Sequence, residues 1–149
     1  MSENKEEIPI SVFYIGLLIV NLIAGILLLA TDFGGFFYDT GTLNIWDFVN
    51  IINPIGAPII LIVAICFFYS VFFSLMKLFK KEDTLPENAL NIGYYLSIVA
   101  LILVLLGTIA VVIIGLDATD WWFDTGFYAG IIGGILNFLL YFLMKRQGL

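Results

Sequence analysis

Four long apolar segments, separated by shorter polar stretches, set the pattern of this chain. They cover residues 9–30, 54–76, 88–115 and 127–144, and none of them contains Asp, Glu, Lys or Arg. A helix needs roughly 20 mainly apolar residues to cross the hydrocarbon core of a bilayer. The pattern therefore predicts an all-α integral membrane bundle of four transmembrane helices, which form a single domain over residues 1–149.

A second pattern occurs between the first two apolar segments, at residues 43–52. Asn44, Asp47 and Asn50 recur at every third position, and mostly apolar side chains fill the positions between them. This spacing favours a short interfacial helix that lies on the membrane surface. The alternative is that these residues extend the second transmembrane helix outward.

The charges outside the apolar segments predict the orientation. Basic residues occur only before the first segment, after the second and after the fourth. With four crossings these places share one side of the membrane, and basic residues concentrate on the cytoplasmic side. The opposite side carries six aspartates and no basic residue. We therefore predict a multi-pass protein of the cell membrane with its N and C termini cytoplasmic.

Composition argues against several classes of function. The chain is 62% hydrophobic and 12% charged, whereas soluble domains are about half apolar and about a quarter charged. It has no His, and Cys66 is its single cysteine, which excludes His-based catalysis and a disulfide within the chain. We expect no cofactor and no nucleic-acid partner, and we assign no metal site. A hard cation held by the outer aspartates is the alternative left open.

Short sequence matches indicate an internal repeat. Ala-Thr-Asp occurs at residues 30–32 and 118–120, and Asp-Thr-Gly follows each copy, at 39–41 and 124–126. Leu-Met-Lys closes the second and the fourth apolar segments. The matches favour two related helical hairpins in the same orientation, because parallel repeats of this kind are related by an axis along the membrane normal. Chance similarity is the alternative.

The paired Asp-Thr-Gly motifs, which begin at Asp39 and Asp124, resemble the active-site motif of pepsin-like and retroviral aspartic proteases. In that family two such loops meet and their carboxylates share a proton. The resemblance covers three residues in each copy, and the short outer segments leave little chain for the β-structure that the family needs. We interpret both motifs as turns, with Asp capping and Gly at positive φ. The remote alternative is an enzyme that uses the outer-loop Asp-Thr-Gly pair.

Small and polar residues at helical spacing mark packing faces on the first and fourth segments. These two segments run in opposite directions, and each presents Gly toward the outside, Asn in the middle and Tyr toward the inside. The fourth segment also carries a Gly-x-x-x-Gly motif, which is typical of closely packed membrane helices. The helix-packing candidates are Tyr14, Asn21 and Gly25 on the first segment, and Gly130, Gly134, Asn137 and Tyr141 on the fourth.

Matched depths predict direct contact between these two segments. We expect Asn21 and Asn137 to hydrogen-bond to each other, because an amide without a partner is costly in hydrocarbon. Glycines at 25 and 134 would let the two backbones approach closely. Tyrosines at 14 and 141 would fill a wider inner gap and keep their hydroxyls near water. The alternative is that the two amides form a polar site for a substrate or an ion.

Together these features favour a non-catalytic multi-pass membrane protein, an assembly or accessory subunit that acts through helix packing. Its expected partners are the lipid bilayer and either further copies of itself, as a homo-oligomer, or other membrane subunits. No acidic or basic residue lies within the four segments, and such residues mark pumps and coupled transporters. The alternative is a small channel or uncoupled transporter formed by oligomerisation.

Overall fold

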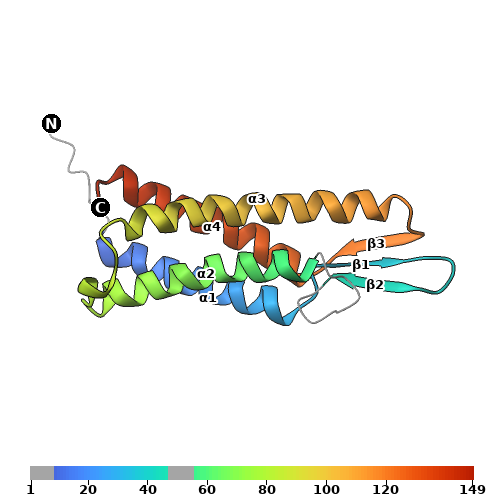
Figure 1. Cartoon of the computed structure of the whole chain (residues 1–149), viewed down its shortest axis with the longest axis horizontal. Coiled ribbons are helices and arrows are strands. Elements are labelled where there is room, and N and C mark those ends of the chain that lie inside the picture. The colour runs from blue at the N-terminus through green and yellow to red at the C-terminus, as the bar shows by residue number, and fades with distance from the viewer. Residues whose placement is uncertain (1–8, 47–55) are drawn as a thin grey trace, which may run out of the picture.

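Four long helices make up most of the protein. The computed structural model describes residues 9–46 and 56–149 (Figure 1). All four helices are long and apolar enough to cross a membrane, which confirms the predicted set of four candidate spans. The helices are α1 (Ile10–Ala30), α2 (Gly56–Leu78), α3 (Ala89–Gly115) and α4 (Thr125–Arg146).

The observed helix ends differ from the predicted ones by two residues at most where both are described. α4 starts two residues earlier than predicted because Asp124 caps it, with its Oδ1 accepting a hydrogen bond from the backbone N–H of Thr125 at 2.6 Å. α2 continues two residues further, to Leu78. The start that we predicted for this helix, at residue 54, lies outside the described residues.

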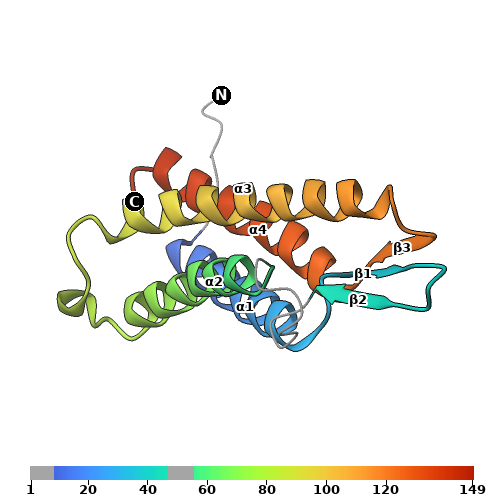
Figure 2. The ribbon, with the colours of Figure 1, turned by 45° about the vertical axis from the view of Figure 1, so that its right-hand side comes forward.

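The helices pack as a four-helix bundle in chain order. α1 packs against α2 and α4, and α3 packs against the same two helices, whereas α2 and α4 barely touch across the diagonal. All four run along the long axis of the molecule, as two views show (Figure 1, Figure 2). α1 begins and α4 ends at the same end of the bundle.

A small β-sheet extends from the other end of the bundle, which we call the strand end (Figure 1). It consists of β1 (Gly34–Phe37), β2 (Leu43–Trp46) and β3 (Asp120–Phe123), in the order β2-β1-β3. β1 pairs antiparallel with both neighbours. The pairing of β1 with β3 ties the segment that follows α1 to the segment that precedes α4.

Part of the predicted interfacial helix, over residues 43–52, is wrong. Residues 43–46 form strand β2, and residues 47–52 lie outside the described part of the chain. Antiparallel pairing with β1 gives the backbone of these residues its hydrogen-bond partners, so they do not need a helix for that purpose. The alternative extension of α2 to these four residues is wrong for the same reason.

Two tryptophan rings of β3 pack closely against glycines, one in the neighbouring strand and one at the end of α3. The ring of Trp122 lies directly over Gly35 of β1, and the ring of Trp121 lies against Gly115 at the end of α3. A Cβ atom at either glycine would overlap the ring next to it. The glycines therefore admit bulky aromatic side chains at short distance, and the sheet is held against the last turn of the longest helix.

Candidate functional site: a buried polar layer

Among the described residues, five Asn and Ser side chains are fully buried inside the bundle, and one of them, Ser74 of α2, lies only four positions from the helix end opposite the strands. The other four, one from each helix, lie between eight and eleven positions from that end. At 1.5 Å per residue that distance is roughly 12–17 Å, so the four lie at a similar depth near the middle of a bilayer. We call them the polar layer: Asn21 on α1, Ser70 on α2, Ser97 on α3 and Asn137 on α4.

Asn21 and Asn137 are in direct contact, as their matched depths predicted. Nδ2 of Asn21 donates hydrogen bonds to Oδ1 of Asn137, at 3.0 Å, and to the backbone carbonyl of Leu17, at 2.8 Å. Both amides are fully buried. The first bond links α1 to α4 in the interior of the bundle.

The predicted role of Gly25 and Gly134 in this helix pair is wrong. A Cβ atom on Gly25 would lie 3.2 Å from the Phe68 ring of α2, and one on Gly134 would lie 3.4 Å from Leu101 of α3. The close approach of α1 and α4 instead occurs one position away, at Gly133, where an added Cβ would overlap the Cβ of Ala24. One residue turns the direction of a side chain by about 100° around the helix, which moves it to another neighbour.

The Gly-x-x-x-Gly motif of α4 faces α3. A Cβ atom on Gly130 would lie 3.2 Å from Val104, one turn along from the contact of Gly134 with α3. Two glycines one turn apart leave a flat strip on which a second helix can approach. The motif therefore marks a packing contact, and its partner is α3.

The expectation that Tyr141 keeps its hydroxyl near water is wrong. Tyr141 is fully buried, and its phenol end lies against Gly93 of α3, with the Ser70 side chain close by. Its ring packs against Phe73, with 5.8 Å between centroids, and Tyr14 packs on the same ring at 6.0 Å. Side chains of a helix lean toward its N-terminus, so Tyr141 points back toward the middle of the bundle.

Three buried polar atoms of this region have no hydrogen-bond partner among the described residues: Oδ1 of Asn21, Nδ2 of Asn137 and the hydroxyl of Tyr141. A buried polar group without a partner costs about 1–3 kcal/mol. Together the three offer an acceptor, a donor and a hydroxyl. Such groups can bind water or a small uncharged polar molecule, and none of them carries a charge.

The sequence led us to the two asparagines but not to four further contributors. Ser70 and Ser97 join the same layer, Gly93 makes room for Tyr141, and Gly133 makes room for Ala24. Small residues are common in membrane helices, so composition alone does not single these out. Their similar distance from one end of each helix is the signal that could have identified the two serines.

The two Asp-Thr-Gly motifs adopt different structures. The first forms the turn between β1 and β2, where Gly41 has a φ of +78° and its N–H donates to the carbonyl of Tyr38 at 2.8 Å. Oδ1 of Asp39 accepts a hydrogen bond from the Thr119 hydroxyl at 2.8 Å. In the second, Asp124 caps α4 and Gly126 lies within the helix. The turn interpretation is therefore right for the first motif, whereas the second is a helix start.

The aspartates of the two motifs lie beyond opposite ends of the β1–β3 ladder. Phe37, which lies two residues before Asp39, pairs with Asp120. Gly34 pairs with Phe123, the residue before Asp124. Three residues of strand separate these ends, which is roughly 10 Å. Carboxylates that share a proton must be in contact, and these two are held apart by the sheet.

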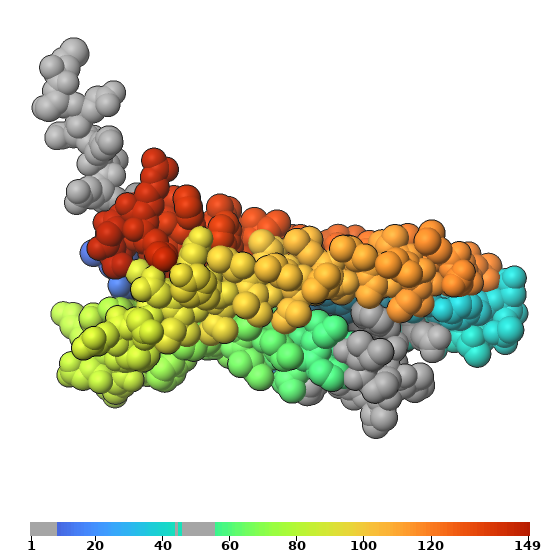
Figure 3. Space-filling view, turned by 45° about the horizontal axis from the view of Figure 1, so that its top comes forward, coloured from blue at the N-terminus to red at the C-terminus, as the bar shows by residue number. Residues whose placement is uncertain are grey.

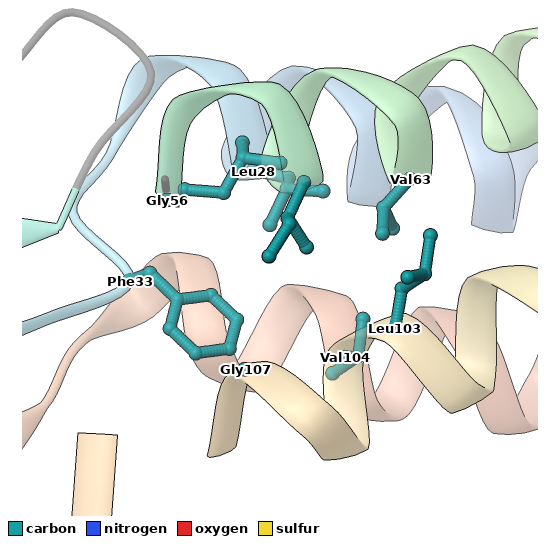
Figure 4. A pocket seen from close by; sticks show the side chains of 9 residues that line it. Leu28, Phe33, Gly56, Val63, Leu103, Val104 and Gly107 are labelled. Carbon is teal, nitrogen blue, oxygen red and sulfur yellow. The ribbon is translucent and has the colours of Figure 1, made fainter. Parts of the chain in front are cut away.

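The described residues offer little that could hold a metal ion or a large ligand inside the bundle. No group of three or more Cys, Asp or Glu side chains gathers in residues 9–46 and 56–149. A cavity of about 10 Å³ lies toward the strand end, and the Phe33 ring and Val104 line it (Figure 4). Its lining is apolar, so it lacks the polar partners that a bound water needs.

Comparisons with known proteins find no relative. No protein-family model matches the chain, no curated protein sequence is significantly similar to it, and no solved structure is significantly similar to its fold. What this protein does must therefore be inferred from its own residues and their geometry.

Proposed function

We propose that this is a non-catalytic multi-pass membrane protein, an assembly or accessory subunit that acts through helix packing. The observation that carries the proposal is an apolar stripe along the exposed side of α3, the helix with the smallest buried share. α3 runs along the face of the molecule that Figure 3 shows. Every residue of the stripe is at least 41% exposed within the single chain. The stripe consists of Tyr95, Val99, Ile102, Leu106, Ile109 and Ile113 on α3, together with Leu116, the residue that caps the helix.

The spacing of the stripe supports association with another helix. Its members alternate in steps of four and three residues over three heptads, and this 3.5-residue repeat keeps one face of a helix toward a partner. The stripe carries no charge. Two copies of α3 related by an axis along the membrane normal would present the same stripe to each other, as an isologous contact requires. The proposed partner is therefore a second copy or another membrane subunit with a similar helix.

Cysteine cross-linking tests the stripe directly. In a Cys66→Ala background, Ile109→Cys should give a disulfide-linked dimer on mild oxidation, because disulfides form between Cβ atoms about 4 Å apart. Ile62→Cys is the matched control, since Ile62 is also exposed but lies on α2 outside the stripe. The reaction is run in native membranes and followed by gel electrophoresis without reductant. Equal linking at both positions would contradict a specific stripe.

If Ile109→Cys does not form a dimer, the proposed partner is another membrane subunit and not a second copy of the chain. Purification of the intact protein in mild detergent with mass measurement distinguishes the two. A defined complex with other subunits supports an accessory role, and a homo-oligomer supports self-association. A monodisperse monomer with no partner, together with no cross-link, would contradict the proposal as a whole.

The proposal includes the cell membrane as location and both termini on the cytoplasmic side. The one-sided distribution of Lys and Arg supports this orientation. A common origin of the two hairpins is also part of the proposal, supported by the shared Leu-Met-Lys endings of α2 and α4. The segments that follow α1 and α3 differ in structure, since β1 is followed by a second strand whereas β3 leads directly into α4.

A small channel or uncoupled transporter is the second candidate function. It is favoured by three buried polar atoms that have no partner among the described residues, which a passing polar solute could use. Two of these atoms belong to the polar layer, and the third is the hydroxyl of Tyr141. Flux of small uncharged solutes through liposomes that contain the purified oligomer, reduced by Asn137→Leu, would favour this candidate. The proposal gives Asp39 and Asp124 no catalytic role, and their separation by the sheet supports that view.

A further inference from the structure

A groove runs between α1 and α4 on the outer surface of the bundle. It has a volume of about 340 Å³. Its base is the contact of Ala24 with Gly133, and its walls are exposed aliphatic side chains of both helices, including Ile23 and Ile132. Since these residues belong to the membrane-spanning parts of the helices, the groove opens toward lipid.

The length of the groove matches one leaflet of a bilayer. On α4 the lining runs from Thr125, at the strand end, to Leu136 near the middle of the helix. Eleven residue steps cover roughly 16 Å of helix, and half of a hydrocarbon core is about 15 Å thick. A transmembrane helix would need a surface that continues through both leaflets, so a single hydrocarbon chain is the better match.

Two residues that carry a hydroxyl group line the groove at the strand end, and an aspartate precedes them in the chain. The two residues are Thr125 and Tyr128, and both are exposed. Asp124 precedes them at the cap of α4. By sequence, neither segment at this end of the bundle contains Lys or Arg. This charge distribution attracts an ammonium group and repels an anionic headgroup.

We infer that the groove binds one acyl chain of an amine-bearing phospholipid from the leaflet at the strand end. The chain lies between α1 and α4 down to Leu136. The ammonium headgroup lies at the level of Thr125 and Tyr128, near the Asp124 carboxylate. Tyr128, which is 54% exposed, is of the residue type that prefers this interfacial level.

Native mass spectrometry of the intact protein tests the site. The protein is purified in mild detergent and supplied with dioleoyl phosphatidylethanolamine or with dioleoyl phosphatidylglycerol. We expect one retained phosphatidylethanolamine per chain and weaker retention of phosphatidylglycerol. Ala129→Phe places a ring in the groove and should lower the bound fraction roughly tenfold. Ala30→Phe, at the exposed last residue of α1 outside the groove, should leave binding unchanged.

A second pair of variants covers the case in which Ala129→Phe does not fold. Ile132→Ala removes a wall of the groove and should also weaken retention, whereas Ile135→Ala, exposed on the same helix but outside the groove, should not. Circular dichroism and gel filtration show whether each variant is folded. Equal retention in groove and control variants overturns the inference, as does a folded wild type that retains no lipid.

Other outcomes are equally decisive. Equal retention of the two phospholipids overturns the headgroup assignment. A co-purified protein that is lost in Ala129→Phe, with no lipid bound, overturns the lipid in favour of a helix partner. Because the groove lies on α1 and α4 and the proposed association stripe lies on α3, lipid binding and cross-linking at Ile109 fail independently of each other.

Discussion

Asn21 and Asn137 join α1 to α4 through one hydrogen bond, and each amide keeps another polar atom without a partner among the described residues. In hydrocarbon the alternatives for an amide are few, so a single bond specifies which faces of two helices meet. Its energy is modest, since interhelical hydrogen bonds in membranes average about 0.6 kcal/mol. The pair therefore contributes more to the alignment of the helices than to their stability.

A double-mutant cycle measures this bond. Asn21→Leu and Asn137→Leu should each lower the free energy of unfolding, and the double variant should lose less than the sum of the two. The expected coupling energy is about 0.6 kcal/mol, with about 1.7 kcal/mol as an upper value. Unfolding in mixed micelles with increasing dodecyl sulfate gives the free energies. Strict additivity of the two substitutions would show that the bond contributes nothing in the membrane protein.

At the scale of the helices, glycines decide how closely each pair approaches. Gly133 lies at the contact of α4 with α1, whereas Gly134 faces α3 with ordinary van der Waals space around it. Neighbouring residues of the same type thus serve different interfaces. The same holds for Gly93, whose missing side chain leaves the room that the Tyr141 ring occupies.

Alanine substitutions at the adjacent glycines should have different effects. Gly133→Ala forces its Cβ into Ala24, so we expect a loss of about 1–3 kcal/mol in the free energy of unfolding. Gly134→Ala places its Cβ 3.4 Å from Leu101, and Ala is a better helix former than Gly by about 1 kcal/mol, so this variant should be neutral or more stable. The same detergent unfolding assay compares them. An equal loss in both would mean that the helix contacts are not those described.

The helices could be predicted from the sequence, whereas the sheet and the packing contacts could not. Runs of apolar residues without charge fix the helices because the bilayer demands internal hydrogen bonding of each span. The strands are four residues long, and β1 contains Gly34 and Gly35, so local composition does not favour them. Their pairing partners lie far apart in sequence. The rotation of each helix about its axis also depends on its neighbours, which is why Gly133 was missed beside Gly134.

At the scale of the whole molecule, acidic and basic residues are distributed unevenly between the two ends of the bundle. The strand end carries acidic residues and the opposite end carries the basic ones, including Lys77 and Lys145. Lys77 pairs with Glu82 at 3.0 Å, and Lys145 lies over the Tyr94 ring at 4.5 Å. Exposed pairs of this kind contribute little stability.

Thiol labelling of intact cells tests the proposed orientation. In a Cys66→Ala background, Asp39→Cys in the β1–β2 turn should react with a membrane-impermeant maleimide, because this end should face outward. Lys80→Cys and Gln147→Cys, at the opposite end, should react only after the cells are opened. All three positions are exposed, so access to the reagent alone decides the result. Labelling of Lys80→Cys in intact cells would reverse the orientation.

The pairing of β1 with β3 also has a consequence for the order of events during synthesis. β1 is the central strand of the sheet, and one of its two neighbours is made only after α3. Until Asp120–Phe123 has been translated, that side of β1 has no strand to pair with. Such long-range pairing is formed late because a long stretch of chain must be closed first. A nascent chain that stops after α3 would therefore expose an open strand edge, which is the kind of surface that chaperones and proteases recognise.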